Sequence, residues 1–213
     1  VMDLWDPDDR VGMLVDEWGT WHEVETDTNP GFLYQQNTIR DAIAASLTLD
    51  IFNRYCRRVH GANIAQTVNV LQAMILTEGE HMLLTPTYHV FEMYLPHHDA
   101  TNLPVYIDAG TIGEGDTETP AISASASRAE DGSVHVTMTN LSATDTITVP
   151  VALHGVTGTT CKARVLTGNA MNSHNTFDAP DTVAPVEFDG VKLRAGGADV
   201  DLPARSVVAF TVS

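Results

Sequence analysis

The sequence is poor in basic residues and contains no long apolar run. Lysine and arginine together number 11 against 28 acidic residues, which gives a formal net charge of −17. A surface of this charge offers no basic stripe to nucleic acid and is repelled by an anionic membrane. No apolar segment approaches the ~20 residues that a membrane span requires, and no charged-then-apolar leader opens the chain. These absences exclude nucleic-acid binding and membrane insertion as functions.

Cysteine is also scarce, and histidine lacks the spacing of a metal site. The two cysteines, Cys56 and Cys161, lie far apart and predict free buried thiols rather than a disulfide framework. Free thiols suit a reducing compartment, so the prediction is a cytoplasmic protein, with any signal peptide lying upstream of Val1. The nine histidines show no spacing typical of metal ligands, and His97 and His98 are merely adjacent. The sequence therefore predicts no metal site and no cofactor.

One stretch, Val11–Trp21, joins a short apolar run to two carboxylates and two tryptophans. Such a run indicates a buried, parallel strand, and strands that deliver acids at their carboxyl ends build the active sites of (β/α) barrels. Because side chains alternate along a strand, Asp16 and Glu17 should face opposite sides. By that parity Glu17 shares the pocket face with Met13 and Val15. A solvated pair of loop carboxylates is the alternative, although the tryptophans favour a sugar-binding site.

The rest of the first hundred residues predicts a βαβ unit. Apolar residues at four-residue steps predict a helix over 38–59, capped by Asn37 or Thr38 and ended by Gly61. Alternation over 62–70 predicts the second strand, in which Gln66 and Asn69 are either structural hydrogen-bonding residues or ligand contacts. A connecting stretch through 77–80 leads to a short helix near 86–94.

Residues 101–213 differ in composition, because they are rich in threonine, serine and valine and contain recurrent turn signals. Short strands are predicted at 121–128, 133–140, 146–153, 160–167, 191–194 and 206–212. Several short strands at this spacing indicate a β-sandwich. It contains no tryptophan and few other aromatic residues, which favours an accessory structural domain over a sugar-binding module.

Two parallel strands cannot close a barrel, which needs eight. Their apolar composition calls for burial on both faces, and Val1–Asp9 resembles the tail of a preceding element. We therefore expect a fragment of α/β plus all-β class: residues 1–100 form the last part of a (β/α)8 TIM barrel, and residues 101–213 form a C-terminal β-sandwich (jelly-roll) domain.

Ordered blocks along the whole chain resemble the α-L-arabinofuranosidases of glycoside hydrolase family 51. The blocks are Asp16-Glu17-Trp18-x-x-Trp21, Asn29-Pro30-Gly31-Phe32, Asn63–Val70, Leu84–Phe91, Asn175–Pro180 and Val183–Ala184–Pro185. The resemblance implies a retaining, exo-acting enzyme that releases terminal L-arabinofuranosyl units from arabinose-containing oligo- and polysaccharides. It also implies association into homo-oligomers.

The same resemblance assigns roles to individual residues. Glu17 would be the nucleophile, Gln66 would bind the sugar hydroxyls, and Trp21 would wall the leaving-group side of the pocket. Many members have asparagine where this chain has Gly19, which leaves the local hydrogen bonding open. The acid/base glutamate of the family follows an asparagine, and no Asn-Glu dipeptide occurs here. We therefore expect the missing upstream segment of the barrel to supply it and the chain alone to be inactive.

Two alternatives remain on the sequence. One is another retaining glycosidase, such as a xylosidase or an endoglucanase, since a nucleophilic glutamate is common to many barrels. The other is a non-catalytic sugar-binding or assembly module whose working part is the sandwich.

Overall fold

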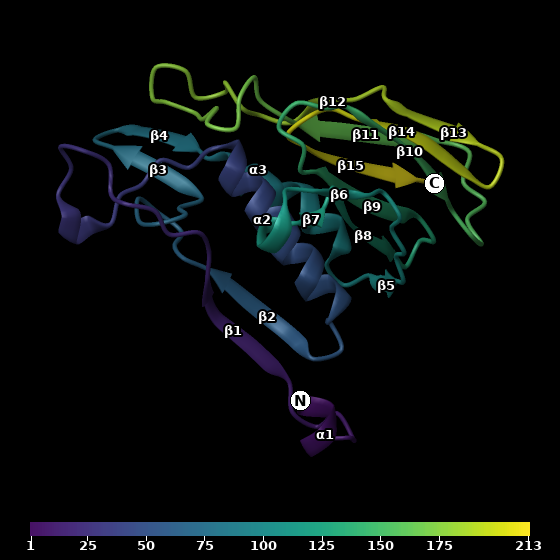
Figure 1. Ribbon diagram of the computed structural model, residues 1–213. Coiled ribbons are helices and arrows are strands. Elements are labelled where there is room, and N and C mark those ends of the chain that lie inside the picture. The colour runs from purple at the N-terminus through teal and green to yellow at the C-terminus, as the bar shows by residue number, and fades with distance from the viewer.

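A parallel strand pair covered by helices forms the first half of the chain. The computed structural model describes all residues, 1–213, and pairs β1 (Met13–Trp18) in parallel with β2 (Val59–Ile64), with α2 (Ile39–Arg54) between them in sequence. Figure 1 shows α2 between this pair and the sheets of the second half. The βαβ unit is confirmed, and a short helix α1 (Met2–Trp5) precedes it.

The helices cover only one face of this two-stranded sheet. Val15, Ala62 and Ile64 pack against the cluster centred on α2 and α3 (Pro86–Tyr94). Met13 and Leu14 remain exposed, so the predicted burial of the first strand on both faces is not found. No helix of the chain is both long and apolar enough to cross a membrane.

Helix α2 begins as predicted but ends early. Thr38 is its N-cap and forms a capping box with Asp41, whose Oδ2 accepts from the Thr38 amide at 2.8 Å. The last helical residue is Arg54, so the predicted end near 59 is wrong, and Gly61 lies inside β2. Arg58 is held instead by aspartates of the N-terminal segment, including Asp6 at 2.6 Å.

The second strand is shorter than its alternating pattern suggested. It ends at Ile64, and residues 65–74 form a loop instead of continuing to Val70. Asn69 and Leu71 in this loop have φ angles of 61° and 53°, which an extended strand cannot accommodate. Gln66 and Asn69 therefore lie beyond the strand.

The stretch expected to be a plain connection is a hairpin. Strands β3 (Ile75–Glu78) and β4 (His81–Leu84) pair antiparallel around Gly79, and Leu76 faces Leu83 across the ladder. These two leucines and Ala73 form a small core against which Tyr34 and Phe177 pack. The short apolar segments gave too few alternations to be recognised. Helix α3 has the predicted bounds.

The second half is a β-sandwich, as predicted. Its larger sheet has the order β12-β11-β15-β9-β8-β5 and the smaller one β10-β14-β13. The bounds are β5 (Thr101–Leu103), β8 (Ile122–Arg128), β9 (Val134–Asn140), β10 (Ile147–Ala152), β11 (Cys161–Leu166), β12 (Val186–Glu187), β13 (Val191–Arg194), β14 (Gly197–Leu202) and β15 (Ser206–Val212). Between β5 and β8 in the sequence, β6 (Thr111–Ile112) and β7 (Thr119–Pro120) form a separate two-stranded sheet. The apolar core between the two sheets includes Val136, Val200, Val208 and Phe210.

Strand β14 was missed although it is central in the smaller sheet. Its sequence is Gly-Ala-Asp-Val-Asp-Leu, and only Ala198, Val200 and Leu202 of it are apolar residues that pack in the core. All three are fully buried. The thiols were also only partly as expected: both cysteines are free, but Cys56 is exposed.

Helix α2 packs on the face of the larger sheet that is turned away from the smaller one. A buried polar cluster lies at this contact, where Asp50 accepts from Tyr94 and Ser125, each at 2.6 Å. Burial raises the pKa of Asp50, and burial together with the Asp50 charge raises that of Tyr94. Leu166 and Val207 of the sheet join the apolar cluster of the helices. The contact therefore mixes apolar packing with internally satisfied polar groups.

Candidate active site

The carboxyl ends of β1 and β2 meet at one edge and bring the predicted residues together. Trp18 is the register partner of Ile64, and the Ala65 amide donates to the Trp18 carbonyl at 2.9 Å. Glu17 immediately precedes Trp18 on β1, and Gln66 lies two residues after Ile64, in the loop that follows β2. Both side chains are exposed. The edge is thus the place where a ligand could contact a carboxylate and a free amide at once.

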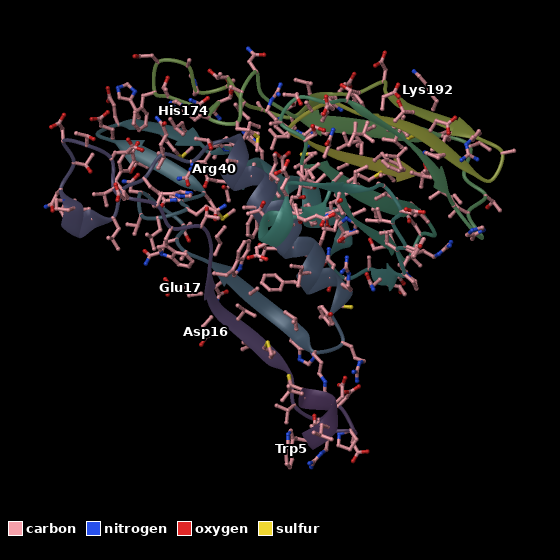
Figure 2. All side chains as sticks on the ribbon, in the orientation of Figure 1. Trp5, Asp16, Glu17, Arg40, His174 and Lys192 are labelled. Atoms are coloured by element: carbon pink, nitrogen blue, oxygen red, sulfur yellow. The ribbon has the colours of Figure 1, made fainter.

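A bulge at the end of β1 changes the predicted orientation of the two carboxylates. Between the pairs Val15–Ala62 and Trp18–Ile64, β1 advances three residues while β2 advances two. Strict alternation therefore fails here, and the parity argument that separated Glu17 from Asp16 is wrong. Both carboxylates are exposed, and Figure 2 shows both beside the carboxyl-terminal part of β1.

Trp18 anchors this bulge in the helix layer. Its ring stacks on Phe91 with centroids 5.9 Å apart and meets Phe52 edge-on at 5.4 Å. The residue is 8% exposed, whereas Trp21 is 50% exposed. The two tryptophans therefore have different roles, since Trp18 fixes the strand end and only Trp21 has a ring face available for a ligand.

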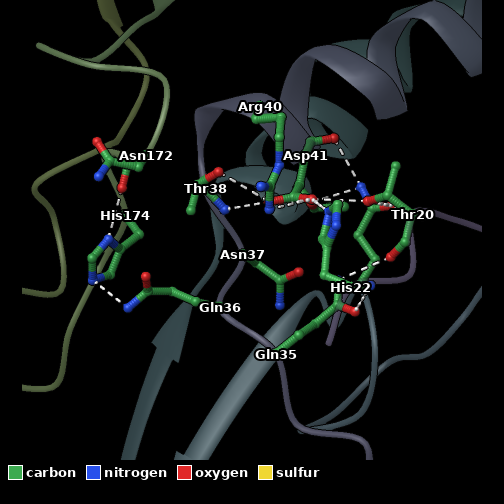
Figure 3. Close-up of polar contacts among 12 residues, drawn as sticks. Thr20, His22, Gln35, Gln36, Asn37, Thr38, Arg40, Asp41, Asn172 and His174 are labelled. Atoms are coloured by element: carbon green, nitrogen blue, oxygen red, sulfur yellow. Dashed lines mark hydrogen bonds and ion pairs between the residues drawn. The ribbon is translucent and has the colours of Figure 1, made fainter. Parts of the chain in front are cut away.

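Side-chain amides hold the backbone that leads from the bulge to Trp21. The Thr20 amide donates to Gln72 Oε1 at 2.7 Å, and the Thr20 carbonyl accepts from Gln35 Nε2 at 2.9 Å. The His22 amide donates to Gln35 Oε1 at 3.0 Å. Figure 3 shows these contacts around Thr20 and His22. The two glutamines thus satisfy backbone groups on both sides of Trp21, as a neighbouring strand would.

Asp41 lies behind this segment and is fully buried. Its Oδ1 accepts from Thr20 Oγ1 at 2.8 Å and contacts His22 Nε2 at 3.2 Å, while its Oδ2 caps α2 through Thr38. Arg40 Nη2 lies 3.3 Å from the same Oδ2. A single carboxylate therefore joins the start of the helix to the segment that carries Trp21.

Gln72 connects this segment to the loop after β2. It is fully buried, and its Nε2 donates to the Asp41 carbonyl at 2.8 Å and to Thr87 Oγ1 at 3.2 Å. At Gly19, where φ is +154°, a Cβ atom would lie 3.3 Å from Gln72 Oε1. Glycine suits this close approach and this unusual conformation. Gln72 therefore supplies the hydrogen bonds beside Gly19.

Sequence reasoning missed Gln35, Asp41 and Gln72. The pattern Thr38-x-x-Asp41 was available as a capping-box signal, but nothing in the spacing of the glutamines indicated burial. Chemically, the edge offers carboxylates, an amide and an indole to a ligand. No group of three or more histidine, cysteine, aspartate or glutamate side chains is arranged to hold a metal ion.

Solved structures with the same arrangement set the class of protein. The chain superposes over its whole length on the family 51 arabinofuranosidase from Xanthomonas axonopodis pv. citri, with a TM-score of 0.96 and 48% identity, covering 43% of that chain. A xylanase of glycoside hydrolase family 30 from Talaromyces cellulolyticus shares the fold at a TM-score of 0.60 and 17% identity, over 96% of this chain and 41% of its own. The class is that of the glycoside hydrolases.

The family follows from sequence. Residues 16–206 match the model of the alpha-L-arabinofuranosidase C-terminal domain. An intracellular exo-alpha-L-arabinofuranosidase from Bacteroides ovatus is 44% identical over 209 residues, which are 98% of this chain and 41% of that protein. The chain belongs to the family 51 α-L-arabinofuranosidases, and it spans about two fifths of the length of these relatives.

Proposed function

We propose that this chain is the carboxyl-terminal part of a retaining, exo-acting α-L-arabinofuranosidase that releases terminal L-arabinofuranosyl units from oligo- and polysaccharides. The observation that carries the proposal is the full-length superposition on a family 51 arabinofuranosidase at 48% identity. It supports the sandwich and the strand pair as parts of one enzyme.

Glu17 is the proposed nucleophile. A retaining glycosidase uses one carboxylate to attack the anomeric carbon, which breaks the glycosidic bond and forms a glycosyl-enzyme ester. A second carboxyl group about 5 Å away first protonates the leaving oxygen and then activates the water that hydrolyses the ester. The exposed carboxylate of Glu17 at the strand edge leaves its oxygens free for this attack.

Gln66 and Trp21 are the proposed substrate contacts. Gln66 has no hydrogen bond from its side chain within the chain, so both its donor and acceptor groups are free for sugar hydroxyls. The half-exposed ring of Trp21 offers an apolar face on the leaving-group side. Gln35 and Gln72 hold the backbone on both sides of Trp21 through hydrogen bonds to Thr20 and His22.

The acid/base group and the remaining strands are proposed to come from a segment that completes a (β/α)8 TIM barrel with residues 1–100, while residues 101–213 form the jelly-roll domain. The exposed apolar residues of β1, Met13 and Leu14, are the surface that such strands would cover. We also propose a homo-oligomer and a cytoplasmic location. The Bacteroides ovatus relative is described as intracellular.

Neighbouring carboxylates provide a matched test of the nucleophile. In the complete enzyme, Glu17→Gln should lower kcat for an aryl arabinofuranoside by orders of magnitude, because the covalent step is lost. Asp16→Asn removes a charge that is also exposed, one residue away, and should change kcat by less than about tenfold. A mechanism-based 2-fluoro arabinosyl label should appear by mass spectrometry on the Glu17 peptide. Labelling of Asp16, or turnover that survives Glu17→Gln, would refute the assignment.

The chain alone gives a second test. Without an acid/base partner it should not turn over the same substrate, and robust turnover would contradict the barrel-fragment hypothesis. The similarity to the family 30 xylanase shows the fold alone. To test whether the complete protein is instead a xylosidase or an endoglucanase, its turnover of aryl xylosides and glucan oligosaccharides is measured in parallel. Saccharide binding without any turnover by the complete protein would favour a non-catalytic module.

A further inference from the structure

A groove of about 660 Å³ lies on the loops that leave the carboxyl ends of β1 and β2. Residues 28–34 of the β1–α2 connection form one side, and residues 69–78, from the loop after β2 into β3, form the other. Phe177, from the connection between β11 and β12, closes it. Its volume is in the range of sites that hold small ligands.

Aromatic side chains from separate segments line this groove. Phe32 is 69% exposed at the tip of its loop, while Tyr34 and Phe177 pack partly on the core under the β3–β4 hairpin. Aromatic residues make up only 7% of the chain, so three of them around one groove is a concentration. Exposed apolar surface gathered in this way marks a binding surface.

The walls are fixed before any ligand binds. Asn69 and Thr77 exchange hydrogen bonds, with the Thr77 amide 2.7 Å from Asn69 Oδ1 and Asn69 Nδ2 2.9 Å from Thr77 Oγ1. The Leu71 amide donates to the Leu33 carbonyl at 2.9 Å and so joins the two sides of the groove. Asn29 Oδ1 accepts from the Gly31 amide at 3.0 Å and shapes the loop that carries Phe32. A preorganised groove loses little entropy on binding.

The charge of the groove selects the class of ligand. Glu78 is the only charged residue that lines it, and no lysine or arginine is present to receive an anion. Burial and the nearby carboxylates of Glu25 and Glu78 raise the pKa of Tyr34, so its hydroxyl stays protonated and can donate. Aromatic faces with carboxylate, amide and hydroxyl groups suit a neutral polyhydroxyl chain.

We propose that this groove is a distal saccharide-binding site for the neutral polysaccharide that carries the terminal sugar. The inference rests on the proposed function, because the groove is built from the same two connections that follow the strands of Glu17 and Gln66. A saccharide seated against Phe32, Tyr34 and Phe177 would add affinity for polymeric substrates without contacting the reacting bond.

Binding by the 213-residue chain tests the site without any need for turnover. Neutral xylo- and arabino-oligosaccharides of increasing length are titrated by calorimetry against the wild type and Phe32→Ala. The control is Tyr106→Ala, which removes an aromatic ring that is also exposed but lies in the second half of the chain, outside the groove. We expect affinity to increase with length, Phe32→Ala to weaken Kd about tenfold, and Tyr106→Ala to leave it unchanged. Glu78→Gln, which preserves shape, is the second variant and should weaken binding severalfold.

Several outcomes would overturn the site. These are unchanged Kd in both Phe32→Ala and Glu78→Gln, absence of saturable binding by any oligosaccharide, or preference for a cationic peptide. Loss of self-association in Phe32→Ala by sedimentation, with saccharide binding intact, would make the groove a contact between copies. In the complete enzyme, Glu17→Gln tests the proposed function separately. If it abolishes turnover while Phe32→Ala leaves binding unchanged, only the groove assignment fails.

Discussion

Replacing Gln72 by leucine should destabilise the chain although the change keeps the side chain similar in size. The amide of Gln72 makes four hydrogen bonds in a fully buried position, to the Thr20 amide and hydroxyl, the Asp41 carbonyl and Thr87. Leucine would leave these partners without the bonds. At about 1 kcal/mol for each bond, less the gain from burying an apolar side chain, the free energy of unfolding should fall by about 3 kcal/mol.

Urea denaturation followed by circular dichroism measures this loss. With a slope of about 2 kcal/mol per molar, the midpoint should move down by roughly 1.5 M urea. Gln66→Leu is a matched control, because Gln66 is an exposed glutamine six residues away in the same loop. It should shift the free energy of unfolding by less than about 0.5 kcal/mol.

The two glutamines should also differ in the complete enzyme. Gln66→Leu is expected to raise KM for an aryl arabinofuranoside while the stability stays unchanged, since it removes a proposed sugar contact. Gln72→Leu should affect turnover only through the position of Trp21. Equal unfolding free energies for the wild type and Gln72→Leu, or a large loss of stability in Gln66→Leu, would refute this division between a structural and a free amide.

Two further predictions concern charged groups away from the edge. Burial lowers the pKa of His97 to about 4 from an ordinary 6.5, so the unfolded chain binds the proton more tightly, and stability should fall by up to about 3 kcal/mol as pH drops from 6.5 towards 4. Denaturation across that range should show a flatter profile for His97→Gln, but not for the exposed neighbour His98→Gln. Arg58→Ala should release residues 1–12 to protease, because Arg58, which is 7% exposed, pairs with three aspartates of that segment. The exposed Arg54→Ala is the control, and equal cleavage in both variants would contradict the prediction.

The elements that were predicted from sequence are those whose packing follows a regular period. Helix α3 and strands β8, β9, β13 and β15 match their expected bounds within a residue, because each alternates or repeats against one core. Strand β14 was missed because glycine, alanine and aspartate are poor strand formers, although its buried Ala198, Val200 and Leu202 alternate with exposed aspartates. The β3–β4 hairpin was missed because its strands have only four residues each. Short elements have too few residues to establish a period.

The end of β1 shows why the site was only partly predictable. The residues at the edge could be named from their types and from the family blocks, but their orientation depended on a bulge that no residue pattern announces. The bulge exists because Trp18 must reach Phe52 and Phe91 in the helix layer while Val15 packs in the same direction three residues earlier. Tertiary packing therefore overrides the alternation of an ideal strand.

The residue pattern alone left two roles open for both Gln66 and Asn69 in the loop after β2, and in the structure their side chains differ in hydrogen bonding. The side-chain nitrogen and oxygen of Asn69 both form hydrogen bonds with Thr77 and so connect the loop to β3. Asn69 therefore has a structural role. Gln66 makes no such bond and stays exposed beside the strand end that carries Glu17. An exposed amide loses little stability by having no protein partner, so nothing in the fold itself requires glutamine at this position. The amide is therefore available for the sugar contact that we propose for Gln66.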